Sequence, residues 1–469
     1  MYIYRRVQEL LKTARRIGGL SAQKIYEKMR REGAVLAGLG VANLPLLDLL
    51  PAIGVTRLSV RDRTLPSADT LARISALSAH TAFGQGYLDL PMRGVIFRTP
   101  SLRPDHPALV AARQAGAVVL TEAALLLSLT PADIFAVTGS DGKTTTAMMC
   151  AAMLSAAGRR VHLGGNIGTP LLSRVFEMAH TDALVLELSS FQLMDMSPPV
   201  GRCAITNITE NHLDWHLDMS EYTAAKRRIL GGGVGILGVG CPPSLAVSDA
   251  VRVGHTDPNT PYAVFSDGGA VYAKREGTLT RLFAADALCI PGRHNLENAM
   301  TAAALTVEAV SPEAMSDALS RFRGAPHRTA YVGCFRGIRC YDSSIDTTPA
   351  RTMTSLKAFD SPVTVILGGR DKNLSYDALA DALRERAHAV VLCGECADKI
   401  ASALERADPE GSLPRQQAES LEEAVAAAFR MAAPGGAILL SPAATSFDQF
   451  RNYSERGDRF AALCRMQQS

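Results

Sequence analysis

Short runs of apolar residues, each followed by a helical stretch, recur along most of the chain. They are Ala34–Ala37, Leu58–Val60, Ile134–Val137, Ala183–Glu187, Cys203–Thr206, Val363–Leu367, Ala389–Leu392 and Ala437–Leu440. Continuous apolar runs of this length are typical of strands buried on both faces, as in parallel sheets. Because helical stretches separate these strands, the pattern predicts an α/β fold built on parallel sheets.

The length of the chain requires more than one domain. At 469 residues it exceeds the usual range of about 100 to 200 residues for one compact core. We expect three α/β domains, at residues 33–130, 131–323 and 324–469, after a helical extension at residues 1–32.

The extension carries the pattern of a basic amphipathic helix. Apolar residues recur in it at helical spacing, at Ile3, Val7, Leu10, Ala14 and Ile17. Nine Lys or Arg residues against three Glu occupy much of the rest. We interpret the segment as an appendage that packs on the first domain and is dispensable for chemistry. Docking on an anionic membrane surface is the alternative.

Composition and charge narrow the function classes. Hydrophobic residues make up 47% and charged residues 20% of the chain, which is typical of a globular protein. A formal net charge of +3 gives no strong field that would attract nucleic acid. No apolar run approaches the length of about eighteen residues that predicts a membrane span, and the N-terminus lacks the apolar core of a signal peptide. Nine cysteines at no disulfide-like spacing favour a reducing compartment, so we expect a cytoplasmic protein.

A glycine turn follows the first predicted strand. Gly38–Asn43 leads into a helix, and the next predicted strand, Leu58–Val60, leads to Asp62 about twenty residues after the glycines, which is the arrangement that seats a nucleotide at a helix N-terminus. Asn43 stands where the third glycine of the dinucleotide fingerprint should be. The turn alone therefore does not distinguish a nucleotide site from a structural turn.

The strongest local signal is Gly139–Thr144, between a predicted strand and a predicted helix. Backbone N–H groups and a helix N-terminus in such a loop cradle phosphates. We expect Lys143 to reach the β- and γ-phosphates and Thr144 to ligate magnesium. The loop is shorter than the usual phosphate-loop pattern, so a chance turn is the alternative.

Two further side chains are expected near the phosphates. Glu187 ends a buried apolar strand, and ligands collect at the carboxyl ends of parallel strands. A magnesium ion would remove the cost of burying this carboxylate, and His212 lies in the acidic cluster that follows. Lys226 lies on a helix that Asp218 caps, and its spacing alone predicts a solvated lysine.

In chain order these motifs resemble those of the Mur ligase family. The motifs are Thr138–Thr146, Gly164–Gly168, Glu187–Gln192, Thr206–Thr209 with His212–Asp214, Lys226, and Gly292–Asn295. The resemblance runs from about residue 34 to the C-terminus. Two segments, Glu187–Leu193 and Ser441–Phe450, resemble the members of the family that add D-glutamate. The fold that the resemblance implies is a Rossmann-like N-terminal domain, a P-loop central domain and a Rossmann-like C-terminal domain.

The resemblance also implies a reaction. ATP would phosphorylate the carboxylate of UDP-N-acetylmuramoyl-L-alanine, and the amine of D-glutamate would attack the acyl phosphate to form an amide, in peptidoglycan precursor synthesis. Mg²⁺ at two sites would assist, and Lys226 would be carbamylated to give a carboxylate-like metal ligand. We expect a monomer with these small-molecule substrates, no nucleic-acid partner and no stable membrane insertion.

The residue roles follow from the same resemblance. The catalytic residues would be Lys143, Glu187, His212 and Lys226, and the metal ligands Thr144, Glu187, His212 and Lys226. ATP would contact Gly139, Ser140, Asp141, Gly142, Lys143, Thr144, Thr145, Asn295, Asn298, Arg328 and Asp342. The UDP substrate would contact Gly38, Leu39, Gly40, Val41, Ala42, Asn43, Asp62, Arg63, Asn166 and Ser189. D-glutamate would contact Lys372, Ser446 and Tyr453.

The sequence departs from the family pattern at several positions. Ser344 stands where the D-glutamate-adding members commonly have a lysine, Asn211 replaces an aspartate, and Thr99-Pro-Ser101 replaces a Ser-Pro-Gly turn. Three alternatives remain. One is another ligase of the superfamily, such as a folylpolyglutamate synthase, and one is an inactive nucleotide-binding homologue. The third is a dinucleotide-binding oxidoreductase, which would leave the phosphate loop without a role.

Overall fold

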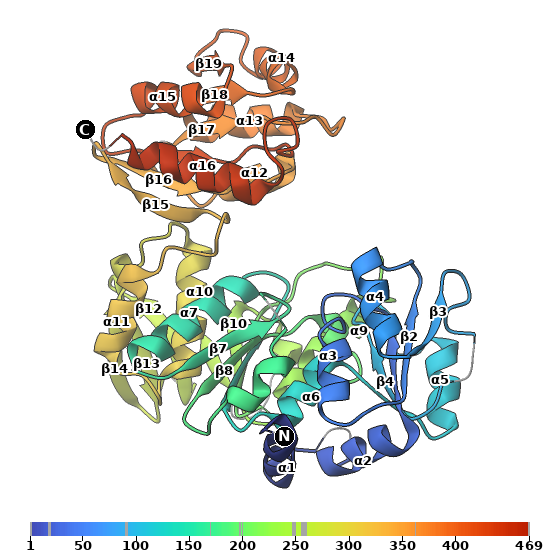
Figure 1. Ribbon diagram of the computed structural model, residues 1–469. Coiled ribbons are helices and arrows are strands. Elements are labelled where there is room, and N and C mark those ends of the chain that lie inside the picture. The colour runs from blue at the N-terminus through green and yellow to red at the C-terminus, as the bar shows by residue number, and fades with distance from the viewer. Residues whose placement is uncertain are drawn as a thin grey trace. The chain divides into compact units, whose positions relative to one another are not determined.

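The chain forms two compact units that are described separately (Figure 1). The computed structural model describes residues 2–467 except 17–19, 90–91, 169, 197, 199, 246–249, 255–259 and 362. Unit 1 comprises Met1–Ala284 and Glu297–Ser316, and unit 2 comprises Ala285–Leu296 and Asp317–Ser469. No helix in the described ranges has the length and apolar character needed to cross a membrane.

The first sheet of unit 1 has five parallel strands in the order β3-β2-β1-β4-β5. The strands are β1 (Ala34–Ala37), β2 (Leu58–Asp62), β3 (His80–Phe83), β4 (Val95–Arg98) and β5 (Val118–Leu120). The helices around it are α2 (Ala22–Glu32), α3 (Leu46–Ala52), α4 (Ala68–Ala76), α5 (Pro107–Gln114) and α6 (Glu122–Leu129). Leu36 packs on one face of the sheet and Val35 on the other, so the apolar run at β1 is buried on both sides as predicted.

The second sheet of unit 1 has nine strands in the order β14-β13-β12-β11-β10-β9-β6-β8-β7. They are β6 (Asp133–Thr138), β7 (Val161–Gly165), β8 (Ala183–Glu187), β9 (Arg202–Asn207), β10 (Val234–Gly240), β11 (Val251–Val253), β12 (Tyr262–Asp267), β13 (Ala270–Arg275) and β14 (Thr278–Ala284). The helical segments around it are α7 (Lys143–Ala156), η1 (Leu172–Glu177), α8 (Ser190–Leu193), α9 (Met219–Arg227), η2 (Arg228–Gly231) and η3 (Pro243–Leu245). Helices α10 (Arg293–Thr306) and α11 (Pro312–Arg321) have residues in both units, and η4 (Ala285–Ala287) belongs to unit 2.

The end of this sheet is antiparallel, which the strand-helix pattern did not predict. Two-residue turns, Gly268-Gly269 and Glu276-Gly277, join β12 to β13 and β13 to β14, and all four residues have positive φ. Turns of this kind match the twist of hairpin strands and are a sequence signal for hairpins.

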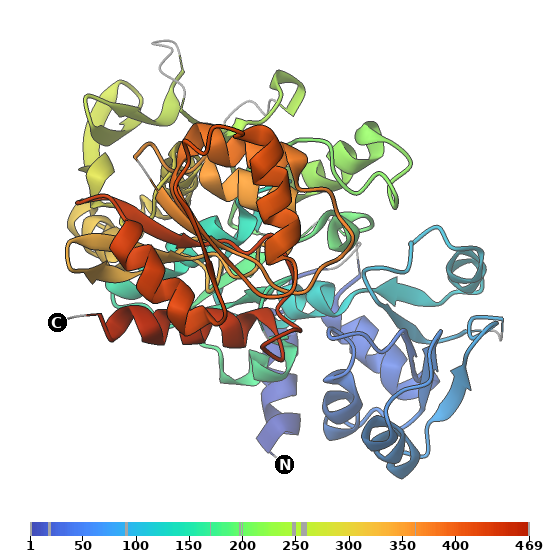
Figure 2. The ribbon, with the colours of Figure 1, turned by 90° about the horizontal axis from the view of Figure 1, so that it is seen from above.

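Unit 2, which is coloured mainly orange to red in Figure 2, contains a six-stranded sheet in the order β15-β16-β20-β17-β18-β19. Its strands are β15 (Ala330–Phe335), β16 (Ile338–Asp342), β17 (Val363–Leu367), β18 (Ala387–Cys393), β19 (Arg415–Ala418) and β20 (Ala437–Leu440). Its helices are α12 (Pro349–Leu356), α13 (Asp377–Arg386), α14 (Ala397–Ala407), α15 (Leu421–Met431) and α16 (Tyr453–Arg465). Residues of α12, α13 and α14 cover one face and residues of α15 and α16 the other. Only the pair β15 and β16 is antiparallel among the pairings described.

Each sheet falls within one of the predicted α/β domains, so the predicted fold class is confirmed. The domain boundaries themselves stay a prediction.

The N-terminal segment is two helices, α1 (Tyr2–Thr13) and α2, so the prediction of one helix is wrong. Ile17 lies outside the described residues. The interpretation as an appendage is also wrong, because Ile25 and Met29 of α2 are 1% and 2% exposed in the main core of unit 1. The hydroxyl of Tyr26 donates to the Ile53 carbonyl at 2.8 Å. Helix α2 packs on the first domain as expected, and α1 packs on α6 and η1.

We predict that Ile25→Ala destabilises unit 1 by about 2–5 kcal/mol, because it leaves a cavity in the core. Lys24→Ala, on the exposed face of the same helix, should change stability by less than about 0.5 kcal/mol. Urea unfolding followed by circular dichroism measures both. Equal effects of the two changes would contradict the assignment of α2 to the core.

Candidate functional site

The loop between β6 and α7 has a backbone that only glycine permits at two positions. Gly139 and Gly142 have φ values of 150° and 77°. A Cβ on Gly139 would lie 1.8 Å from the Thr206 hydroxyl, and a Cβ on Gly142 would lie 2.2 Å from the Asn298 side chain. The loop therefore has the strand-turn-helix context that the sequence predicted, with N–H groups at the start of α7.

Neighbouring side chains hold this loop in place. The Asn207 side-chain oxygen accepts the N–H groups of Ser140 and Asp141 at 3.1 and 2.8 Å. The Lys226 ammonium donates to the Gly139 carbonyl at 2.7 Å. These bonds satisfy two N–H groups and one carbonyl of the loop, so neighbouring side chains hold its backbone in place without a ligand.

The side chains after the loop meet a buried carboxylate. The Thr144 hydroxyl donates to one oxygen of Glu187 at 2.7 Å, and the Asn166 amide donates to the other at 3.2 Å. Glu187 is only 2% exposed and ends β8. The Lys143 ammonium folds back to the Gly139 carbonyl at 2.9 Å. The structure thus brings together the predicted phosphate-binding and metal-binding residues Lys143, Thr144 and Glu187.

Burial and nearby positive charges lower the pKa of two side chains beside the loop, Lys226 and His212. Burial, and to a smaller extent the nearby charge of Lys143, lower the pKa of Lys226 to about 7. Burial, followed by the charges of Lys143 and Lys226, lowers the pKa of His212. Lys226 is 2% exposed, so the expectation of a solvated lysine from spacing alone is wrong. Helix α9 turns this side chain inward, under the loop, rather than to solvent.

The residues present fit a magnesium ion that arrives with phosphates. In the described part of the chain, no three His, Cys, Asp or Glu side chains form a ready-made metal cage. Thr144 and Glu187 nevertheless offer hard oxygen donors at one point. Mg²⁺ commonly takes one or two carboxylates and completes its shell with phosphates and water.

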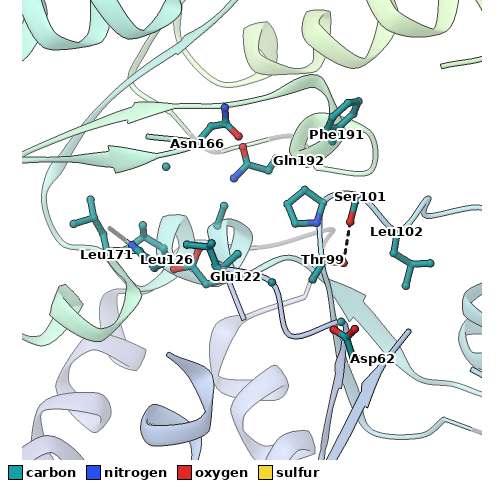
Figure 3. Close-up of a pocket in the computed structure, with 18 of the residues that line it drawn as sticks. Asp62, Thr99, Ser101, Leu102, Glu122, Leu126, Asn166, Leu171, Phe191 and Gln192 are labelled. Carbon is teal, nitrogen blue, oxygen red and sulfur yellow. Dashed lines mark hydrogen bonds between the residues drawn. The ribbon is translucent and has the colours of Figure 1, made fainter. Parts of the chain in front are cut away.

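A cavity of about 1020 Å³ adjoins this site within unit 1 (Figure 3). Asp62, Thr99, Ser101 and Leu102 lie toward one end, and Asn166, after β7, and Gln192, in α8, lie across from them. Among the predicted UDP-binding residues, the structure places Gly38, Gly40, Val41, Ala42, Asp62, Arg63 and Asn166 in the lining.

Three other predicted residues do not line the cavity. Asn43 is fully buried, and its side chain donates to the carbonyls of Gly38 and Phe97 at 2.8 and 2.9 Å, so it braces the turn. Leu39 contributes its N–H to Asp62 at 2.6 Å. Ser189 caps α8 in a capping box.

Two arginines that the sequence interpretation missed join the first sheet to the second. Arg98 is fully buried at the end of β4 and forms a bidentate pair with Asp195. It also donates to the Phe191 carbonyl at 3.0 Å, in the segment that lines the cavity. The sequence feature that could have identified Arg98 is a charged residue at the end of an otherwise apolar strand.

The second arginine contacts helix α9. Arg103 donates to Glu221 at 2.8 Å and to the Trp215 carbonyl at 2.7 Å. The Trp215 indole donates to the Ser101 carbonyl at 2.9 Å. Tyr222, one residue after Glu221, shares a 2.9 Å hydrogen bond with Ser140 of the phosphate loop. The cavity wall and the phosphate loop are therefore connected through α9.

Unit 2 brings its predicted D-glutamate residues to adjacent loops. Lys372 is exposed in the loop after β17, and Ser446 is 2% exposed in the loop after β20. The Arg370 N–H donates to the Thr445 carbonyl at 2.8 Å, which ties the two loops together. Tyr453 begins α16.

A buried arginine that sequence reasoning missed organises these loops. Arg456 is 4% exposed and donates to the carbonyls of Ser344 and Ala444 at 3.0 and 3.1 Å. Its Nε also donates to the Ser344 hydroxyl at 3.0 Å, and that hydroxyl donates to the Tyr453 carbonyl. Ser344 thus has a structural role at the position where a lysine was expected.

The remaining predicted ATP-contacting residues occupy different settings. Asn298, in unit 1, accepts a hydrogen bond from Thr146 at 3.2 Å. Asn295, in unit 2, donates to the Pro291 carbonyl at 2.6 Å. Asp342 pairs with His327 at 2.7 Å, and Arg328 is exposed.

Fold and site define an α/β protein with a phosphate loop and an adjoining cavity large enough for a nucleotide-linked substrate. Comparison with known proteins is consistent with this class. The family model described as Mur ligase middle domain matches residues 137–306, and the one described as Mur ligase, glutamate ligase domain matches residues 327–444.

Curated relatives extend the match to nearly the whole chain. UDP-N-acetylmuramoylalanine--D-glutamate ligase of Ruminiclostridium cellulolyticum is 36% identical over 461 residues, which cover 94% of this chain and 98% of that protein. The enzyme of the same name from Acetivibrio thermocellus is 36% identical over 463 residues, covering 93% and 97%. The chain belongs to the Mur ligase family.

Solved structures share the fold. The UDP-N-acetylmuramate-alanine ligase from Thermotoga maritima has a TM-score of 0.53 at 20% identity and covers 92% of this chain and 99% of its own. A UDP-N-acetylmuramoyl-L-alanyl-D-glutamate--2,6-diaminopimelate ligase has a TM-score of 0.57 at 15% identity, with 95% and 94% covered. The predicted three-domain Mur ligase architecture is confirmed.

The ion pair of Arg103 with Glu221 predicts a pH-dependent stability. Hydrogen bonds from Arg103 lower the pKa of Glu221 to about 2, below its unfolded value. The stabilisation is therefore complete above about pH 4.5 and is lost as the pH falls toward 2. Glu221→Gln should cost about 1–2 kcal/mol at pH 7 and much less at pH 3.

Thermal melts at both pH values measure this difference, with the exposed Glu210→Gln as the matched control. A loss for Glu221→Gln that is the same at pH 7 and pH 3 would contradict the assignment of the charge to the contact with Arg103.

Proposed function

We propose that this chain is an ATP-dependent ligase that joins D-glutamate to the carboxylate of UDP-N-acetylmuramoyl-L-alanine in peptidoglycan precursor synthesis. One observation carries the proposal. Asn166 lines the large cavity and also bonds to Glu187, which bonds to Thr144 at the phosphate loop. A substrate carboxylate at that end of the cavity would lie beside the phosphates of ATP. The names of the relatives supply the identity of both substrates.

ATP and magnesium are the expected cosubstrate and ion, because Mur ligases depend on ATP and generally require Mg²⁺. Lys143 and the N–H groups at the N-terminal end of α7 would bind the phosphates, since the N–H groups of Ser140 and Asp141 already donate to Asn207. Thr144, Glu187 and His212 would hold magnesium, which supplies charge neutralisation as the phosphoryl group moves. We propose two metal positions, with the modified Lys226 at one of them.

The burial of Lys226 supports the proposed carbamylation. The residue is 2% exposed, and its amine nitrogen lies 4.6 Å from the Tyr222 ring centre and donates to the Gly139 carbonyl. A neutral amine attacks carbon dioxide, whereas an ammonium does not. The carbamate would carry the negative oxygens that the metal position lacks in the unmodified lysine.

The chain's residues would act in two steps. In the first, a carboxylate oxygen of the nucleotide substrate attacks the γ-phosphorus and ADP leaves, while Lys143 neutralises charge on the transferring group. In the second, the amine of D-glutamate attacks the acyl carbon. The amide forms, and phosphate leaves with the proton that the amine loses.

The cavity would hold the nucleotide-linked sugar. Its volume of about 1020 Å³ is at the upper end for small-molecule sites, as a substrate of this size requires. Asp62 and Arg63 would bind the uridine diphosphate end, and Asn166 the end that carries the reacting carboxylate.

In unit 2, Lys372, Ser446 and Tyr453 would bind D-glutamate. A substrate with two carboxylates needs cationic and hydroxyl donors. Lys372 is exposed, and its ammonium makes no hydrogen bond or ion pair with the described residues, so the ammonium is available to a ligand. Arg328 and Asp342 of the same unit would contact ATP. We place the reaction in the cytoplasm, and we propose a monomer without nucleic-acid or membrane partners.

The direct test is ADP release with UDP-N-acetylmuramoyl-L-alanine, Mg²⁺ and a panel of amino acids. We expect turnover with D-glutamate and little with L-alanine, L-lysine or diaminopimelate. A better rate with a diamino acid would assign the chain to another branch of the family. No turnover with any acceptor would favour an inactive homologue.

We predict that Lys372→Ala raises the KM for D-glutamate roughly tenfold to a hundredfold and leaves the KM for ATP nearly unchanged. The reason is that a charge-assisted hydrogen bond is worth about 1.5–3 kcal/mol. Lys357→Ala, an exposed lysine at the end of α12, is the control and should change neither constant. A variant at Lys372 that weakens ATP and spares D-glutamate would refute the assignment.

A further inference from the structure

One end of the substrate cavity contains a carboxyl group with no role in the proposed reaction. Glu122, the first residue of α6, lines the cavity and is 6% exposed. Its neighbours in the lining, Ala123, Leu126 and Leu171, are apolar. Figure 3 shows Glu122 with Leu126 and Leu171 at the end away from Leu102.

Only one of its two oxygens has a protein partner in the described residues. Oε1 accepts the Leu172 N–H at 3.2 Å, at the start of η1. Oε2 has no hydrogen bond within the described residues, and protein atoms do not enclose it completely. The second oxygen is therefore reached from the cavity. A polar atom that opens into a binding cavity takes its hydrogen bond from water or from a ligand.

The surroundings favour the neutral acid. Burial raises the pKa of Glu122 to about 7, against the smaller opposing effect of the Leu172 N–H. A neutral carboxylic acid has one O–H donor and one acceptor. With the acceptor used by Leu172, the O–H is left to donate into the cavity.

No charged side chain contributes to this shift, whose causes are burial and the Leu172 N–H. The charged or titratable residues on the packed elements and in the cavity wall, among those whose side chains are described, are Arg6, Glu9, Lys12, Lys24, Tyr26, Glu27, Lys28, Arg30, Arg31, Glu32, Arg174, Glu177, Asp62, Arg63, Tyr87 and His106.

We propose that Glu122 is a substrate-binding residue that donates a hydrogen bond to an uncharged carbonyl oxygen of the sugar, namely that of the acetamido group. This inference rests on the proposed function, from which the N-acetylated sugar is taken. The apolar residues Ala123, Leu126 and Leu171 suit the acetamido methyl group, and an uncharged donor suits its carbonyl. The diphosphate, being anionic, is better placed at the glycine turn near Arg63.

The test is the affinity for UDP-N-acetylmuramoyl-L-alanine, measured by calorimetry without ATP between pH 6 and pH 8.5. Binding to the native chain should weaken about three- to tenfold as the pH rises through 7, because deprotonation removes the donor. Glu122→Gln keeps a donor and an acceptor, so it should bind as the native chain does at pH 6, with no pH dependence. Glu122→Leu should bind about three- to tenfold more weakly at pH 6.

A ligand analogue with a hydroxyl in place of the acetamido group sharpens the test. It should bind more weakly than the substrate to the native chain, while Glu122→Leu should largely lose this discrimination. Glu177→Gln, at the exposed end of η1, is the matched control and should change nothing. If Glu122→Leu does not fold, the pH profiles of the native chain and Glu122→Gln decide.

Several results would overturn the proposal. One is native affinity for the substrate in Glu122→Leu at pH 6. Another is tighter binding to the native chain as the pH rises, with weaker binding in Glu122→Gln, which would make the carboxylate an acceptor. Failure of the native chain to bind the nucleotide sugar at all would instead overturn the proposed function on which the inference rests.

Discussion

The site depends on one constraint, which is that the short loop between β6 and α7 must present the start of α7 to phosphate while its other polar groups are satisfied by neighbouring side chains. Gly139 and Gly142 allow the backbone to turn where a Cβ would collide with Thr206 and Asn298. The Lys226 ammonium donates a hydrogen bond to the Gly139 carbonyl at 2.7 Å. A loop held in this way loses little entropy when ATP binds, which favours both affinity and orientation.

Side chains of α9 that hold the phosphate loop also connect it to the wall of the substrate cavity. Tyr222 and Lys226 reach the loop from α9, and Glu221 of that helix is held by Arg103 from the first sheet. Arg98 makes a second connection through Asp195. Arg98 is fully buried, so removal of Asp195 would leave its charge uncompensated, whereas Arg103 and Glu221 are partly exposed. We infer that the cavity wall and α9 keep a constant spacing because these arginines join them.

The sequence predicted much of this fold because its strands are apolar over their whole length. Four of the predicted runs, among them Ala34–Ala37 and Val363–Leu367, coincide with whole strands, and the cap of α9 by Asp218 is as predicted. The phosphate loop was also found, since its glycines and lysine are contiguous. The family resemblance assigned Lys226, whose burial the local spacing did not predict.

Other features depend on contacts between residues far apart in sequence, which local patterns do not carry. Arg98 and Arg456 look like surface residues until the loops that surround them are in place. Helix α2 was taken for an appendage because its charged face dominates its composition, although Ile25 and Met29 belong to the core. No sequence pattern pointed to Glu122, because the cavity that it lines is formed by segments far apart in the sequence.

The central claim is that the loop and Glu187 support transfer of a phosphoryl group to a substrate carboxylate. The most direct test is oxygen transfer from UDP-N-acetylmuramoyl-L-alanine labelled with ¹⁸O in its carboxylate, with mass analysis of the phosphate released in the presence of D-glutamate. An acyl-phosphate route predicts one labelled oxygen in each phosphate, because the carboxylate oxygen that attacks phosphorus leaves with it. Phosphate that carries no label while the amide product forms would contradict the account.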